Sequence, residues 1–159
     1  MRGIFVKRTG LVCLVASLVA VGAGRAADPF YVGTWKVVSA VTAPWAAPQR
    51  KPDDTERARL MGKTVVLKTR EISGPRPFAC ARPQYRMTDY GADMIFQGAF
   101  DEMQRVNKKV EPQALAVSLG FASGKIKTLE TGCEIDFHFV NDATAEVGLD
   151  NMVYTLKKQ

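Results

Sequence analysis

Alternation of apolar and polar residues is clearest in the stretch from Cys133 to Val140. An extended chain would place three apolar and three polar side chains on opposite faces there: Ile135, Phe137 and Phe139 on one, and Glu134, Asp136 and His138 on the other. This period of two is typical of a half-buried β-strand. We therefore expect a strand over 133–140 with one face in the core and the other in water.

Similar patterns predict strands over 33–42, 63–69, 85–90, 125–131, 144–149 and 152–158. The last three connections of the chain are short. Asn141-Asp142 and Asp150-Asn151 form two of them, and these residue types tolerate the left-handed backbone of tight turns. Strands that follow one another through such turns pair as an antiparallel meander.

Two short segments carry helix signals. Asp53 can cap a helix over 54–61 that Gly62 ends, and Pro112 stands in the first turn of a helix over 111–120 that Gly120 ends. The apolar run 95–100 fits a strand or a helix equally well, because short apolar runs have no diagnostic period. Together the patterns predict a mainly β fold, an antiparallel up-and-down sheet curled into a barrel or half-barrel with one or two short helices.

Residues 1–26 have the composition of a secretory signal peptide. A basic start precedes an apolar run from Leu11 to Val21, and small residues stand at Gly24 and Ala26. The apolar run is too short for a membrane span. Cys13 lies inside it without the small preceding residues of a lipoprotein signal, so we expect no stable membrane anchor. We expect cleavage after Ala26, which leaves a single β-rich domain over 27–159 in the periplasm or the medium.

Export changes the charge of the chain. The leader carries four of the 22 basic residues and none of the 16 acidic ones, so the net charge falls from +6 to +2. A nucleic-acid partner would need a much stronger positive field. The composition therefore argues against nucleic-acid binding.

Cys80 and Cys133 are the only cysteines after the leader. An even pair in an oxidising compartment favours a disulfide, whereas a reactive dithiol usually has the close Cys-x-x-Cys spacing. We therefore expect a Cys80–Cys133 bond.

The Gly33-x-Trp35 opening of the first strand, in a chain that ends in strands with Lys157-Lys158, resembles the calycin superfamily, which includes lipocalins and small bacterial metalloprotease inhibitors. In those proteins the tryptophan lies at the base of the barrel, and a basic side chain from near the last strand packs across it. The resemblance implies a cation–π contact of Trp35 with Lys157 or Lys158. It also implies a binding or inhibitory role and no catalytic residue.

Inward-facing apolar residues of a closed sheet could fill its interior or line a cavity for an apolar ligand. The sequence assigns this place to Trp35, Val41, Ile135, Phe137, Phe139, Val147 and Leu149. A packed interior is the usual outcome in small barrels. Trp45, between two prolines, is expected to anchor a loop or to cover the barrel mouth.

Metal binding is the alternative function for the polar face of the strand predicted over 133–140. Glu134, Asp136 and His138 would stand about 7 Å apart along one face, too widely to converge on one ion without a partner such as Glu146 on another strand. The simpler interpretation is the wet side of a sheet.

No catalytic or cofactor motif is visible. The single histidine, His138, would have to carry any triad, and neither a Gly-x-Ser-x-Gly turn nor a phosphate or dinucleotide loop is present. The sequence therefore predicts an exported, non-enzymatic binding protein of the cell envelope that needs no cofactor. Its ligand would be a small apolar molecule or a protein partner that it binds or inhibits. The alternatives are a divalent-metal-binding periplasmic protein and an enzyme of unrecognised class.

Overall fold

The structure is a computed structural model that describes residues 28–47 and 53–159. The expected leader and its cleavage point lie outside these residues. Eleven elements follow one another along the chain: β1 Gly33–Thr42, α1 Asp54–Leu60, β2 Thr64–Lys68, β3 Glu71–Ser73, β4 Arg86–Tyr90, α2 Ile95–Val106, α3 Pro112–Ser118, β5 Ile126–Glu130, β6 Phe137–Asn141, β7 Thr144–Leu149 and β8 Met152–Lys158. The predicted mainly β class is confirmed.

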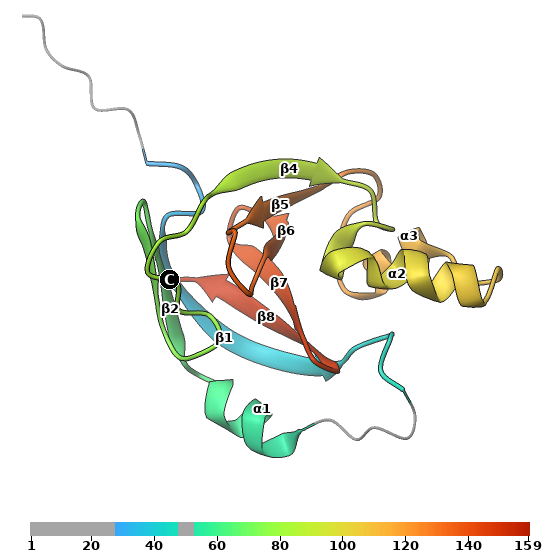
Figure 1. The fold of residues 1–159 in the computed structure, drawn as a ribbon, viewed down its shortest axis with the longest axis horizontal. Helices are drawn as coiled ribbons and strands as arrows, with labels where there is room; N and C mark the ends of the chain where they lie inside the picture. Colours follow the sequence, from blue (N-terminus) through green and yellow to red (C-terminus); the bar gives the residue numbers. More distant parts are fainter. Residues whose placement is uncertain (1–27, 48–52) are drawn as a thin grey trace, which may run out of the picture.

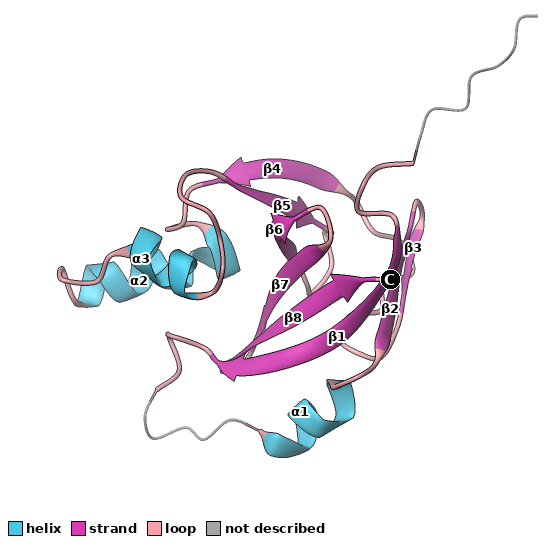
Figure 2. Cartoon of the chain, turned by 180° about the vertical axis from the view of Figure 1, so that it is seen from behind, coloured by secondary structure: helices cyan, strands magenta, loops and turns pink. Residues whose placement is uncertain are grey.

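All eight strands belong to one antiparallel sheet. Their order is β3-β2-β1-β8-β7-β6-β5-β4, so β1 closes against the last strand of the chain and the other neighbours are consecutive. The sheet curls into a half-barrel, with α2 and α3 on one side of it and α1 below β1 (Figure 1). β3 and β4 are the two end strands (Figure 2). This architecture is compatible with a calycin-like fold.

The residues predicted to begin and end the first helix lie at the two ends of α1. The Asp53 carboxylate accepts hydrogen bonds from the backbone N–H groups of Thr55 and Glu56, which satisfies the free donors at the start of α1. Gly62 has a φ of +73°, the left-handed stop that the sequence suggests. The undecided run 95–100 falls at the start of α2, where residues 96–98 interrupt the helical geometry, so the described part of the chain has three helices.

The strand expected over 133–140 begins only at Phe137. The residues before it form a loop held by Thr131, whose N–H donates to the Asp136 carboxylate over 3.0 Å and whose hydroxyl accepts from the Cys133 N–H over 3.1 Å. These side-chain bonds take the backbone groups that a strand would need for pairing. The predicted start of this strand is therefore wrong by four residues.

The two faces of the sheet bury two separate cores. The barrel core fills the concave interior with residues from every strand except β4, and its largest fully buried members include Trp35, Phe78, Phe137, Tyr154 and Leu156. The outer core lies between the convex face and α2 and α3, and its members include Ile95, Phe96, Phe100, Ala116 and Val153. A small domain of this kind gains hydrophobic burial on both faces of its central strands.

The predicted inward set lies in or beside the barrel core with one exception. Ile135, Phe137, Phe139 and Val147 are buried and Leu149 is partly buried. Val41 is 48% exposed, so its predicted inward position is wrong. A bulge between Val37 and Ser39 inserts one residue, and alternation after it places Ala40 beside the barrel core and Val41 outside. Trp45, which was expected to anchor a loop or to cover the barrel mouth, is partly buried against the outer core.

Trp35 and Lys158 meet at one end of the barrel. The Lys158 Nζ lies 5.8 Å from the Trp35 ring centroid and donates a hydrogen bond to the carbonyl oxygen of Phe30. Of the two candidate lysines, Lys158 therefore makes the cation–π contact that the calycin resemblance implies.

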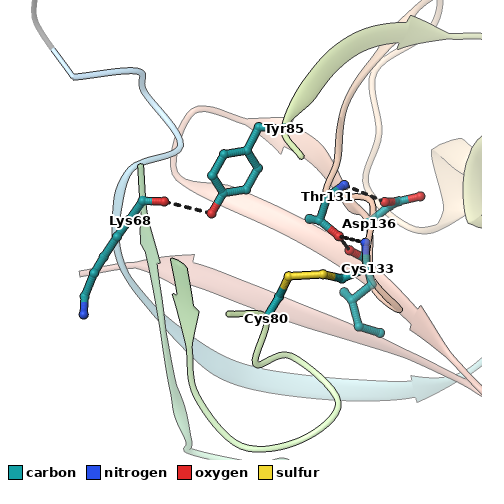
Figure 3. Close-up of a disulfide and its surroundings, with 7 residues drawn as sticks. Lys68, Cys80, Tyr85, Thr131, Cys133 and Asp136 are labelled. Atoms are coloured by element: carbon teal, nitrogen blue, oxygen red, sulfur yellow. Dashed lines mark hydrogen bonds between the residues drawn. A yellow bond between two sulfur atoms is a disulfide. The ribbon is translucent and has the colours of Figure 1, made fainter. Parts of the chain in front are cut away.

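A disulfide ties the two ends of the sheet together (Figure 3). The sulfur atoms of Cys80 and Cys133 lie at bonding distance, as predicted, with 6.4 Å between the Cα atoms. Cys80 bridges to β3, and Cys133 lies in the loop between β5 and β6. Beside the disulfide, the Tyr85 hydroxyl donates to the Lys68 carbonyl over 2.9 Å, which joins the chain before β4 to the end of β2. These links span the gap where β3 and β4 do not pair.

Among the described residues, no helix has the length and apolar character needed to cross a membrane.

Candidate functional site

His138 is buried on the convex face of β6. Its side chain is 4% exposed, because α2 lies over this part of the sheet. Glu134 is exposed in the loop before the strand, and Asp136 is half-buried there. The predicted wet row of Glu134, Asp136 and His138 is therefore wrong for its histidine, and the three side chains do not share one strand face.

Both ring nitrogens of His138 have partners. Nε2 lies 3.0 Å from the backbone nitrogen of Phe96 and accepts its N–H, so the proton of the neutral ring is on Nδ1 and is donated to the Thr128 hydroxyl over 2.8 Å. Burial lowers the pKa of His138 to about 3, since the charged imidazolium would lose its water. His138 is thus a neutral crosslink between the sheet and α2, with no lone pair free for a metal or a proton.

Glu146 lies opposite His138 on β7 and is also buried. Its carboxylate accepts a hydrogen bond from the Thr155 hydroxyl over 3.1 Å, and that hydroxyl accepts one from Ser39 over 2.8 Å. Burial raises the pKa of Glu146 to about 7. A row of polar side chains therefore crosses the convex face from β5 to β1, through His138 and Glu146.

The four predicted metal ligands do not converge. The structure brings His138 and Glu146 to neighbouring positions, but Glu134 and Asp136 do not complete a set with them. Across residues 28–47 and 53–159, no group of three histidine, cysteine, aspartate or glutamate side chains is placed to hold a metal ion.

A left-handed turn stands over His138. Phe96, Gln97 and Gly98 have φ values of +51°, +59° and +79°, which interrupt the start of α2. Each non-glycine residue in this region costs about 1–2 kcal/mol, so surrounding contacts must hold the turn in place. The bond from Phe96 N–H to His138 is one of these contacts. No residue type in Phe-Gln-Gly announces such a turn, apart from the glycine.

Gly148 makes room for the two rings that cover the sheet. A Cβ atom at this position would lie 2.9 Å from Phe96 Cδ1 and 3.3 Å from the Trp45 indole. The two rings lie with their centroids 5.0 Å apart. The Trp45 Nε1–H donates to the Asp150 carbonyl over 2.9 Å, which fixes the orientation of the indole. Trp45 is thus held as a wall over the outer core.

Two hollows share this wall. The polar cleft has a volume of about 110 Å³ and is lined by Trp45, Phe96, Gln97, Asp136, His138, Gly148 and Asp150. The helix groove has a volume of about 500 Å³ and is lined by Trp45, Ala99, Glu102, Met103, Val106, Asn107 and Val110. The groove is mostly apolar and open, and Val106 at its edge is 81% exposed. We take these two hollows as the candidate functional site.

Sequence reasoning missed the helix groove. A signal was present, because the groove residues Ala99, Met103 and Val106 recur at helical spacing, but the run 95–100 was left undecided between strand and helix. The position of Trp45 against this helix has no local signal, since it depends on the Gly148 opening in β7.

No protein-family model, curated protein sequence or solved structure matches this chain.

Proposed function

We propose that this protein is an exported binding protein of the cell envelope, without catalytic activity, that takes a small apolar ligand into the helix groove. The groove itself is the observation that carries the proposal. Val106, Met103 and Val110 offer apolar surface to solvent at a place where folding alone gains nothing from it.

The barrel core supports a site outside the barrel. Phe78 and Phe137 approach to 6.4 Å between ring centroids, and Trp35 and Phe139 approach to 5.7 Å. Side chains of this size occupy the interior of the half-barrel, as is usual in small barrels. An apolar ligand therefore finds its space in the helix groove.

The remaining features agree with an exported binding protein. The leader composition and the Cys80–Cys133 pair favour an oxidising compartment. The calycin resemblance favours a binding role. The full use of both His138 nitrogens supports the absence of catalysis, because the one histidine of the chain has no free group for proton transfer.

Titration with n-octanol, followed through the tryptophan emission of the protein, to which Trp45 in the groove lining contributes, tests the proposal. We expect a saturable change that Val106→Asp abolishes, since a carboxylate would be desolvated by the ligand. Val117→Asp is the matched control, because Val117 is a 49% exposed helical valine outside the groove lining. Equal binding by both variants, or no binding by the wild type, would overturn the proposal.

Native mass spectrometry of the protein taken from the periplasm identifies what the groove carries. A retained small apolar molecule is the expected result. If the protein instead carries a stoichiometric protein partner that Val106→Asp releases, the groove binds a protein and the small-ligand proposal is overturned.

A further inference from the structure

Three neighbouring hollows share lining residues at one end of the sheet. A rim hollow of about 250 Å³ is lined by Asp53, Glu56, Leu149, Asp150, Asn151, Met152 and Tyr154. Asp150 lines both this hollow and the polar cleft, and Trp45 lines both the polar cleft and the helix groove. A ligand seated in the helix groove therefore has an acidic, hydrogen-bonding region directly beyond Trp45.

The polar cleft offers negative charge and no positive charge. Its lining residues include Asp136 and Asp150 and no lysine or arginine. Neither carboxylate belongs to an ion pair within 28–47 and 53–159. His138 is neutral and already bonded on both nitrogens. A group that binds here must therefore donate hydrogen bonds or carry positive charge.

The walls of the polar cleft favour a cation over a neutral donor. Trp45 and Phe96 line it, and an ammonium group over the face of either ring would gain a cation–π contact. The indole orientation is fixed by its bond to the Asp150 carbonyl, so the ring does not have to reorganise on binding. The neighbouring rim hollow is also lined by acidic residues, of which Asp53 caps α1 and Glu56 is paired with Arg59.

We infer that the ligand is a small cationic amphiphile, with an alkyl chain in the helix groove and an ammonium head in the polar cleft between Asp136 and Asp150. Trp45 separates the two parts and contacts both. This inference rests on the proposed function, to which it adds the chemical class of the ligand.

Three eight-carbon probes of the same length test the head group: n-octylammonium, n-octanol and octanoate. At pH 7 and low salt we expect octylammonium to bind about tenfold more tightly than octanol, and octanoate to bind more weakly than either. Raising the salt should weaken only the binding of octylammonium towards the level of octanol.

The Asp136→Asn, Asp150→Asn double variant removes the two charges. The asparagine oxygen can still accept the Thr131 N–H bond that Asp136 accepts. We expect the variant to bind octylammonium no better than octanol, with octanol unchanged. Asp142→Asn removes one charge from the β6–β7 turn, at the opposite end of the sheet, and should change nothing.

The outcomes separate the two proposals. Equal affinity of the wild type for octylammonium and octanol would overturn the cationic head and leave the apolar groove in place. Binding of none of the probes would overturn both. If the double variant does not fold, the salt dependence in the wild type decides, because a salt-independent affinity for octylammonium contradicts a role for the carboxylates.

Discussion

The backbone N–H of Phe96 donates a hydrogen bond to His138 Nε2 over 3.0 Å, and this bond connects the left-handed turn of α2 to strand β6 in the interior of the sheet. The centroids of the His138 and Phe96 rings lie 4.7 Å apart, and the two rings meet edge to face. The turn forms one wall of the polar cleft and leads into the helix that lines the groove. The only histidine of the chain thus supports the candidate site from beneath.

Replacing His138 should destabilise the protein strongly. His138→Leu leaves the Phe96 N–H and the Thr128 hydroxyl buried without partners, which should lower the free energy of unfolding by about 2–4 kcal/mol. Thr128→Val removes only the Nδ1 partner and should cost about half as much. Urea unfolding measures both. A neutral effect of His138→Leu would contradict the crosslink.

Acid should weaken the protein through the same histidine. The pKa of His138 is about 3 in the folded protein, against about 6.5 in an unfolded chain, so only the unfolded state takes up the proton between these values. The stability that the neutral ring provides is complete above about pH 6.5 and is lost as the pH falls towards 3. Urea midpoints from pH 7 to pH 4 should fall more steeply in the wild type than in His138→Leu. Parallel curves would show that His138 is protonated in the folded state.

Glu146 should have the opposite pH dependence. Burial raises the pKa of Glu146 to about 7, above the 4.5 of an ordinary glutamate. The stability of the protein that depends on the protonated side chain is therefore complete below about pH 4.5 and is lost as the pH rises through 7. Glu146→Gln keeps an acceptor for Thr155 and never ionises. Relative to the wild type, it should gain about 1–3 kcal/mol of stability between pH 5 and pH 8. The exposed Glu134→Gln is the control, and an equal response of both variants would contradict a buried, partly protonated Glu146.

Two adjacent lysines should differ in their contribution to stability. Lys158→Met loses the contact with the Trp35 ring and the bond to the Phe30 carbonyl, and should cost about 1 kcal/mol. Lys157→Met removes one positive charge, as Lys158→Met does. Because Lys157 is exposed, this substitution should leave the free energy of unfolding nearly unchanged. Thermal unfolding followed by circular dichroism compares them. A larger loss of stability in Lys158→Met supports Lys158 as the partner of Trp35. A larger loss in Lys157→Met would contradict it.

Loss of the disulfide should open the gap between the end strands. The bond closes a loop of 54 residues, with a sequence separation of 53, which corresponds to about 4 kcal/mol on the chain-entropy model. Cys80→Ala with Cys133→Ala should lower the urea midpoint accordingly. Intact-mass measurement before and after reduction should show the gain of a pair of hydrogens in the exported wild type. Two free thiols in that protein would contradict the bond.

Local sequence was sufficient for most of the strands and for both short helices at 53–62 and 111–120. Strand alternation, the Asp53 cap and the glycine stops each depend on residues close together in the chain. They can therefore be predicted from the local sequence. The outcome for the strand at 133–140 was different, because the Thr131 hydroxyl competes for its first backbone groups. Val41 was misplaced because a one-residue bulge reverses alternation, and no residue type near Val38 signals it.

The sequence by itself determined the mainly β class, the meander and the cysteine pairing, since each follows from local periodicity or from a small choice of partners. The contact of Trp35 with a C-terminal lysine was implied by the calycin resemblance. Only the tertiary structure decided that α2 covers the convex face. That packing turns the polar side of β6 into a buried site, keeps His138 neutral and places Trp45 over Gly148. The candidate binding site exists because segments far apart in the chain meet there, and periodicity along one segment carries no information about what will cover it.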